Sequence, residues 1–227
     1  MNKFELNIKP FGKEAILIEW PNRIDEKILD DIICFTKSIL IIEKSKLNNY
    51  TPGYNSLLLH YVSLIDFGEK KHFLMDLYNS QKQVTKYNPN TWHIPVCYDE
   101  EFGVDLPLFS NQGLTKKEVI HLHTSNCYRV FMIGFLPGFL YLGGLDPKLH
   151  MDRKAKPRLS IPKGSVAIGG EQTGIYPMAS PGGWQIIGRT PLSLFDLNAE
   201  ETTPIRQGDK IQFYAVDHDT YLNLVSD

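Results

Sequence analysis

The chain has 227 residues, enough for one large domain or two modest ones, and 42% of them are hydrophobic while 22% are charged. This composition lies close to the globular average and argues against fibrous, disordered and disulfide-scaffold proteins. The formal net charge of −2 leaves no excess of basic residues to neutralise a phosphate backbone, so we expect no nucleic-acid partner.

Two strand patterns open the chain, and a helical pattern follows them. Residues 4–9 alternate apolar and polar side chains, and residues 15–20 are β-branched and apolar, so both segments are predicted strands. Apolar residues then recur at helical spacing along 24–44. This spacing predicts an amphipathic helix with one face on a core.

A turn, a strand and a second helix complete a predicted ββαβα unit. The Pro-Gly pair within 51–54 marks the turn, 56–64 has a strand pattern, and 67–84 has helical spacing. Residues 85–91 are polar, contain a proline and lack either periodicity, as linkers do. We therefore predict a small N-terminal α/β sandwich domain over residues 1–86.

Glycine and proline mark the second half, because most of the 17 glycines and most of the 14 prolines lie beyond residue 100. They separate short β-like runs at 128–133, 165–168, 185–187 and 210–214. This texture favours a β-barrel domain over residues 92–227, so the predicted fold class is α+β. One helix is predicted to interrupt the barrel, since Thr115 and Glu118 have the spacing of a capping box.

The expected compartment is the cytoplasm. The first ten residues lack the apolar run of a signal peptide, and the longest apolar stretch is too short to span a membrane. Cys34, Cys97 and Cys127 are scattered without a CxxC pair, which fits free thiols in a reducing compartment. We expect no membrane partner.

The segment between His123 and Arg189 carries the densest mixture of glycine, proline, aromatic and charged residues. In GFLPGFLYL, at 134–142, one rigid proline and two permissive glycines alternate with large rings, which favours an apolar loop wall that a ligand can approach. An aromatic-rich barrel corner without a ligand would have the same composition. The sequence leaves both interpretations open.

Arg158, Lys163 and Ser165 surround two prolines that hold the chain extended, a strip that can meet a carboxylate or a phosphate. Ordinary solvated surface charges are the alternative. The glycine-paired loops at 169–174 and 180–184 do not match a P-loop, which requires a Gly-Lys-Ser/Thr sequence opening a helix.

Histidines give a weaker signal. His121 and His123 would point to different faces of a helix, and no third ligand is evident, so no metal site is predicted. His123 alone could act as an acid or a base, and a packed core histidine is the alternative.

Several of these blocks together resemble the family that includes the B-type subunit of 5-oxoprolinase, the sporulation kinase inhibitor KipI and allophanate hydrolase subunit 1. Blocks in the right order are more specific than one short motif. They are His123 with Tyr128 and Val130, the block at 134–142, Pro157-Arg158, Pro162, 164–166, 174–177, 180–184 and 188–190. One departure is Asp152-Arg153, where the family commonly has Pro-Arg.

The resemblance implies that the C-terminal domain is a cyclophilin-like β-barrel. It also implies an ATP-dependent hydrolase subunit that opens 5-oxo-L-proline to L-glutamate and is inactive without its partners. Those partners would be a second barrel-type subunit, similar to the C-type subunit of 5-oxoprolinase, and a third subunit. ATP, with or without Mg, would be bound by the complex. Inhibition of a sensor histidine kinase, or an allophanate hydrolase or urea carboxylase-like role, remains an alternative.

Residue type and matching position suggest a set of site residues. His123 and Arg158 are the predicted catalytic residues, His123 for orienting or deprotonating a water and Arg158 for a phosphoryl group or oxyanion. The predicted substrate-binding residues are Phe135, Pro137, Gly138, Phe139, Ser165, Gln172, Tyr176, Ser180, Gly182, Gly183, Trp184 and Arg189.

Overall fold

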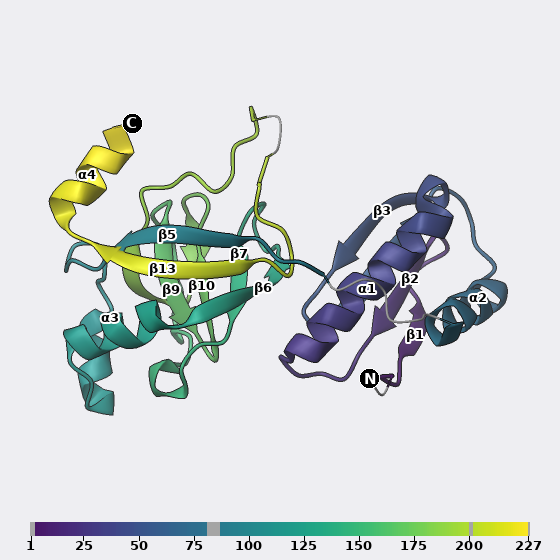
Figure 1. Cartoon of the computed structure of the whole chain (residues 1–227), viewed down its shortest axis with the longest axis horizontal. Coiled ribbons are helices and arrows are strands. Elements are labelled where there is room, and N and C mark those ends of the chain that lie inside the picture. The colour runs from purple at the N-terminus through teal and green to yellow at the C-terminus, as the bar shows by residue number, and fades with distance from the viewer. Residues whose placement is uncertain (1–2, 81–86, 200–201, 227) are drawn as a thin grey trace. The chain divides into compact units, whose positions relative to one another are not determined.

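The computed structural model describes residues 3–80, 87–199 and 202–226. It divides into two compact units, Met1–Asn88 and Pro89–Asp227, each with its own hydrophobic core (Figure 1). Residues 85 and 86 of the predicted linker lie outside the described residues. The end of the helix predicted over 67–84 lies outside them as well.

The N-terminal unit is a two-layer sandwich of one antiparallel sheet and two helices. The sheet has the order β1-β2-β4-β3 and the helices cover one of its faces. The strands are β1 Asn7–Pro10, β2 Ala15–Glu19, β3 Leu47–Pro52 and β4 Ser56–Tyr61, and the helices are α1 Glu26–Glu43 and α2 Phe67–Ser80. The predicted sandwich is confirmed.

Helix α1 forms where its pattern predicts. Asp25 caps it by accepting the backbone N–H of Lys27, and Ile28, Ile32 and Phe35 lie on its fully buried stripe. The predicted ββαβα order was wrong in one respect, because β3 adds a strand before β4. This strand lies at the sheet edge and is mostly exposed, so its sequence shows no apolar alternation.

The C-terminal unit contains a closed seven-stranded barrel, which confirms the predicted barrel (Figure 1). Its order is β10-β7-β6-β13-β5-β12-β9. The strands are β5 Thr91–Cys97, β6 Cys127–Ile133, β7 Leu140–Gly143, β9 Ser165–Gly169, β10 Gln172–Ile175, β12 Gln185–Arg189 and β13 Lys210–Val216. Strands β5 and β13 pair in parallel and close the barrel.

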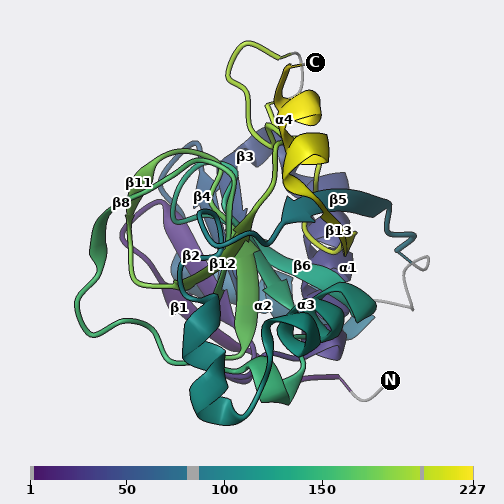
Figure 2. The same cartoon turned by 90° about the vertical axis from the view of Figure 1, so that its left-hand side faces the viewer.

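Two helices and a ribbon accompany the barrel. Helix α3, Lys116–Ser125, begins with the predicted capping box of Thr115 and Glu118. Helix α4, His218–Ser226, was not predicted, and its Tyr221 packs on Phe102 with ring centroids 4.5 Å apart. Strands β8, Arg158–Ile161, and β11, Ser180–Gly182, pair with each other outside the barrel as a two-stranded ribbon (Figure 2). Three 3-10 helices, Lys44–Lys46, Leu106–Gln112 and Pro147–Leu149, complete the described elements.

Candidate functional site

An aromatic cluster covers the outer face of β7, β9, β10 and β12. Side chains alternate along these strands, so that Val166 and Ile168 fill the barrel core while Ala167 joins the outer cluster. Five rings make up what we call the aromatic wall: Phe135, Phe139, Tyr141, Tyr176 and Trp184. Tyr141 lies in the predicted block at 134–142 but was not among the predicted site residues.

Phe139 lies at the centre of the wall. Its ring centroid is 4.7 Å from that of Tyr141, 4.9 Å from Tyr176 and 5.5 Å from Trp184. Phe135 meets it edge-on at 5.8 Å. These tilted and edge-to-face arrangements are the favoured geometry of aromatic pairs, so the wall is rigid.

The loop before β7 presents Phe135 to solvent. This side chain is 63% exposed, and its backbone has a φ of 65°, which a bulky residue rarely adopts. Pro137 stiffens the loop and is exposed as well. Gly138 has a φ of 83°, and a Cβ there would lie 2.6 Å from Cβ of Phe195, so only glycine fits. The sequence therefore holds an exposed ring in a strained conformation.

Trp184 rests on two glycines of the barrel. A Cβ at Gly169 would lie 2.5 Å from the indole ring, and a Cβ at Gly174 would lie 3.0 Å from it. The bare backbone of β9 and β10 therefore forms the seat of the indole. This packing explains Gly169 and Gly174 of the predicted loop at 169–174 without a phosphate, and Gly170 has a φ of 65° that favours glycine.

A charged cluster fastens the segment before the ribbon to the barrel. Asp105 is 3% exposed and receives two hydrogen bonds of 2.8 Å from the guanidinium of Arg158. Lys154 Nζ lies 2.9 Å from the same carboxylate, and the backbone N–H of Ile186 donates to it at 2.7 Å. Both terminal nitrogens of Arg158, a predicted catalytic residue, therefore donate to Asp105.

The carboxylate of Asp105 is ionised in this cluster. Burial acts to raise the pKa of Asp105, but the hydrogen bonds from Arg158, Ile186 and Lys154 outweigh it, so the pKa lies below its usual value. Sequence reasoning missed Asp105, because nothing near residue 105 indicates a partner 53 residues away.

His123 lies inside the barrel and away from solvent. Its ring is 0% exposed, its Nδ1 pairs with the Tyr98 hydroxyl at 2.7 Å, and its Nε2 pairs with the Thr173 hydroxyl at 2.9 Å. It also stacks on Phe213 at 4.6 Å. Burial lowers the pKa of His123 to about 3, so the ring is neutral at physiological pH. The geometry therefore gives this imidazole no contact with a water in solvent, and its catalytic role stays a prediction.

Three predicted binding residues lie apart from the wall's rings. The hydroxyl of Ser165 is buried and donates to the carbonyl of Pro162 at 2.8 Å. Gln172 begins β10, and its Nε2 is buried without a partner among the described residues. Arg189 ends β12, with Cζ 4.7 Å from the ring centroid of Phe102. None of the three has a ring contact to the wall in the described residues.

The remaining predicted residues gather beside the wall. Ser180 and Gly182 lie in β11, where Gly182 is opposite Arg158 of β8, and Gly183 follows. A Cβ at Gly182 would collide with the hydroxyl of Tyr176, so the ribbon packs directly on the wall. The structure thus brings together the rings, the ribbon and Arg158.

Nucleotide binding is not built into the helices of this chain. Asp25, Asp66 and Asp217 each accept a backbone N–H in the first turn of α1, α2 and α4. Thr115 and Glu118 do the same for α3. The four α-helices of the described residues therefore have N-termini already capped, mostly by carboxylates, which repel phosphate. These helix N-termini therefore do not fit the phosphates of ATP.

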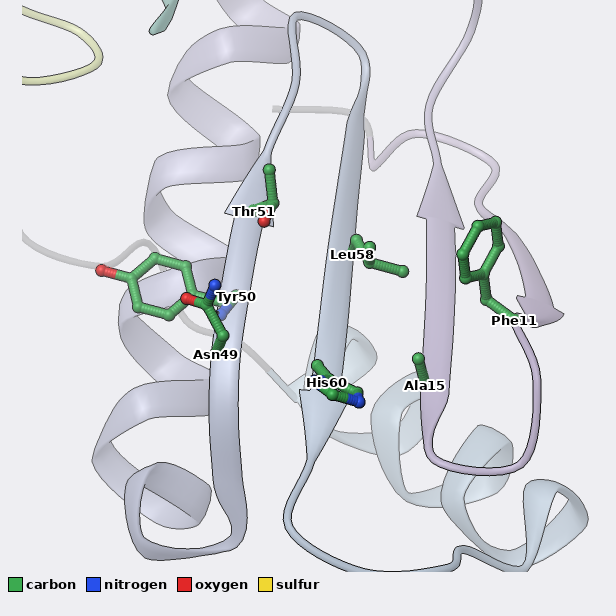
Figure 3. Close-up of a pocket in the computed structure, with 7 residues that line it drawn as sticks. All are labelled: Phe11, Ala15, Asn49, Tyr50, Thr51, Leu58 and His60. Atoms are coloured by element: carbon green, nitrogen blue, oxygen red, sulfur yellow. The ribbon is translucent and has the colours of Figure 1, made fainter. Parts of the chain in front are cut away.

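A shallow hollow of about 360 Å³ lies in the N-terminal unit, on the sheet face that α1 and α2 leave open (Figure 3). It is lined by Phe11, Ala15, Asn49, Tyr50, Thr51, Leu58 and His60, none of which was a predicted site residue. The only ion pair that the described residues show for His60 is with Glu14, at 3.8 Å.

Neither a membrane-spanning helix nor a metal cluster is present among the described residues. No helix there is long and apolar enough to cross a membrane. No group of three or more His, Cys, Asp or Glu side chains in those ranges is arranged to hold a metal ion. The three cysteines are free thiols, as the sequence predicts.

Comparisons with known proteins give consistent matches. A family model described as the carboxyltransferase domain, subdomain C and D, matches residues 6–205. The B-type subunit of 5-oxoprolinase from Haemophilus influenzae is 35% identical over 92% of this chain and 97% of its own length. That of Escherichia coli O157:H7 is 52% identical over 121 residues, 53% of this chain and 56% of that protein. The chain matches little more than half the length of the latter.

Solved structures share the fold. The structure of TTHA0988 has a TM-score of 0.78 at 31% identity, covering 89% of this chain and 40% of that chain. Urea carboxylase of Kluyveromyces lactis has a TM-score of 0.79 at 18% identity, covering 99% of this chain and 23% of that chain. The second likeness concerns the fold alone.

Proposed function

Because this chain belongs to the carboxyltransferase domain, subdomain C and D, family, we propose that it is the B-type subunit of a 5-oxoprolinase. In this role it opens 5-oxo-L-proline to L-glutamate at the expense of ATP, together with partner subunits. The single observation that carries the proposal is the 35% identity to the B-type subunit of Haemophilus influenzae across nearly both full lengths.

The aromatic wall supports a role in holding the substrate ring. A lactam is a flat amide ring, and flat apolar faces pack well on rigid aromatic side chains. The exposed Phe135 and the half-buried Tyr141 give the wall an accessible side. We infer that the lactam packs there and that a partner subunit covers it, because small-ligand sites normally enclose most of the ligand surface.

ATP is assigned to the assembled complex. The capped helix N-termini of this chain leave no phosphate cradle at a helix end among the described residues, so no step of the reaction is placed on a nucleotide held here. A second barrel-type subunit and a third subunit are the proposed partners.

Reconstitution tests the proposal. The chain alone is expected to release no glutamate from 5-oxo-L-proline, whereas the complex with its partner subunits releases it only when ATP is present. Phe135→Ala in the complex is expected to raise KM, because it removes the exposed ring of the wall. Tyr214→Ala, an exposed ring on β13, is the matched control. A reconstituted complex that releases no glutamate overturns the proposal.

Two alternative functions can be tested with the same purified chain and complex. A putative urea carboxylase of Emericella nidulans is 29% identical over 49% of this chain, so allophanate and urea belong in the substrate panel. Turnover of either in place of 5-oxo-L-proline would favour that class. The kinase-inhibitor alternative is decided by adding the chain to a sensor histidine kinase and measuring autophosphorylation.

A further inference from the structure

One cation beside the aromatic wall, Arg153, forms no ion pair with the described residues. Arg153 is exposed, and its guanidinium carbon lies 5.5 Å from the ring centroid of Trp184. The described residues provide no hydrogen bond or ion pair for this guanidinium. A guanidinium on an aromatic face is held in place by cation–π attraction while its N–H donors remain available.

The backbone on both sides of Arg153 is fixed to the two residues that flank Trp184, Gly183 and Gln185. The Gln185 side-chain Nε2 donates to the carbonyl of Asp152 at 2.9 Å, and the Lys154 backbone N–H donates to the carbonyl of Gly183 at 2.7 Å. Arg153 lies between these two bonds. Its position over the indole is therefore set by the backbone as well as by stacking.

Two neighbouring cations are already engaged. Lys154 and Arg158 both bind the buried Asp105, at 2.9 Å and 2.8 Å. Arg189 lies on Phe102 instead of on a ring of the wall. Of the cations that contact the wall or its supporting cluster, Arg153 is the one whose donors have no described partner.

Two tyrosine hydroxyls lie within electrostatic range of Arg153. Burial raises the pKa of both Tyr141 and Tyr176, and the positive charge of Arg153 acts against this rise in each case. Tyr141 also meets Trp184 at 5.7 Å between centroids. Tyr176 is 1% exposed whereas Tyr141 is only half-buried, so Tyr141 is the phenol that a ligand bound to Arg153 could reach.

We propose that Arg153 binds the carboxylate of the substrate acid while the lactam ring packs on the aromatic wall, which makes Arg153 the residue that selects an acid over a neutral lactam. The inference rests on the proposed function and specifies how its substrate is recognised. A planar guanidinium matches a carboxylate with two parallel hydrogen bonds.

The test compares two lactams on the reconstituted complex. Arg153→Gln is expected to raise KM for 5-oxo-L-proline roughly 10- to 100-fold, since a charge-assisted hydrogen bond contributes about 1.5–3 kcal/mol. Its KM for 2-pyrrolidinone, the same ring without the carboxylate, should not change. Arg153→Lys should recover part of the loss, because it restores the charge but not the planar fork. Lys156→Gln, an exposed cation of the same segment, is the matched control and should leave both KM values unchanged.

Equilibrium binding of the two lactams to the same complexes separates the two proposals. Acid-selective binding that Arg153→Gln removes supports this inference even if the complex turns nothing over, an outcome that would reject only the proposed function. If the wild-type complex turns over 5-oxo-L-proline and Arg153→Gln behaves like Lys156→Gln, this inference is wrong and the proposed function stands. The inference on Arg153 is also overturned if the wild-type complex binds both lactams equally, or binds neither of them. Thermal melting of each variant checks that the fold is intact.

Discussion

The neutral, enclosed imidazole of His123 makes stability depend on pH. The ring has a pKa of about 3 when folded, whereas an unfolded histidine has a pKa of about 6.5, so unfolding takes up a proton between these values. Above pH 6.5 both states are neutral and the residue adds no dependence. As the pH falls below 6.5 towards 3, it lowers the free energy of unfolding by about 1.4 kcal/mol per pH unit.

We therefore expect His123→Gln to have a shallower loss of stability in acid than the wild type, measured by urea denaturation at pH 7.5 and 5.0. His121→Gln, an exposed change on the same helix, should keep the wild-type slope. Equal slopes for His123→Gln and the wild type would show that the ring titrates normally in the folded protein.

Asp105 supports the second residue-scale prediction. Asp105→Asn leaves Lys154 and Arg158 without their carboxylate, and breaking a buried ion pair typically costs 3–5 kcal/mol. Both cations are partly exposed, so we expect a smaller loss, about 2–3 kcal/mol at neutral pH. The wild-type contribution is present above the unfolded pKa and is lost as pH falls through the lowered folded pKa. Chemical denaturation measures this loss, and Glu171→Gln, an exposed change, is the control. Equal unfolding free energies for Asp105→Asn and the wild type would contradict the prediction.

At the scale of elements, the hairpin of β9 and β10 makes the wall possible by lacking side chains where the indole lies. Gly169→Ala places a methyl group against Trp184, and overpacking of this kind costs about 1–3 kcal/mol. We expect a lower melting temperature and a shifted tryptophan emission spectrum. Gly134→Ala is the control, since its added Cβ would meet only ordinary contacts at 3.5 Å and beyond. An unchanged emission spectrum in Gly169→Ala would show that the indole is not seated there.

Most elements with a strongly apolar sequence were predictable, whereas the exposed edge strand and the short ribbon strands were not. Helix α1 carries a clear apolar periodicity because one of its sides meets a core, and strands β2, β6 and β13 are short, largely apolar runs buried against a core. Strand β3 lies exposed at a sheet edge, and β8 and β11 are short ribbon strands, so their sequences lack this signal. Tertiary pairing, which composition does not encode, decides them.

The same distinction applies to the site. The rings of the aromatic wall come largely from one sequence block, so composition alone could indicate a wall. The burial of His123 and the pairing of Arg158 with Asp105 depend on residues brought together from distant segments. A histidine in a core and a histidine in a cleft look alike in sequence, and only the structure distinguishes them.

At the scale of the whole molecule, the two units have separate hydrophobic cores that share no residue. Leu59→Ala removes a fully buried side chain from the N-terminal core and is expected to cost that unit about 2–5 kcal/mol. Hydrogen exchange should show faster exchange in β2 and β4 and unchanged protection in the barrel strands. Ile211→Ala, in the barrel core, should give the opposite pattern. A uniform loss of protection across both units would show that they unfold together.

The parallel pairing of β5 with β13 joins residues 91–97 to residues 210–216, the first barrel strand to the last. During synthesis, every barrel strand from β5 to β12 leaves the ribosome before β13, the strand that closes the barrel, is made. Until then both margins of the nascent sheet are open to other polypeptides, which invites aggregation. A stop codon or a stalled ribosome ahead of residue 210 would therefore leave an aggregation-prone fragment whose N-terminal unit can already be folded.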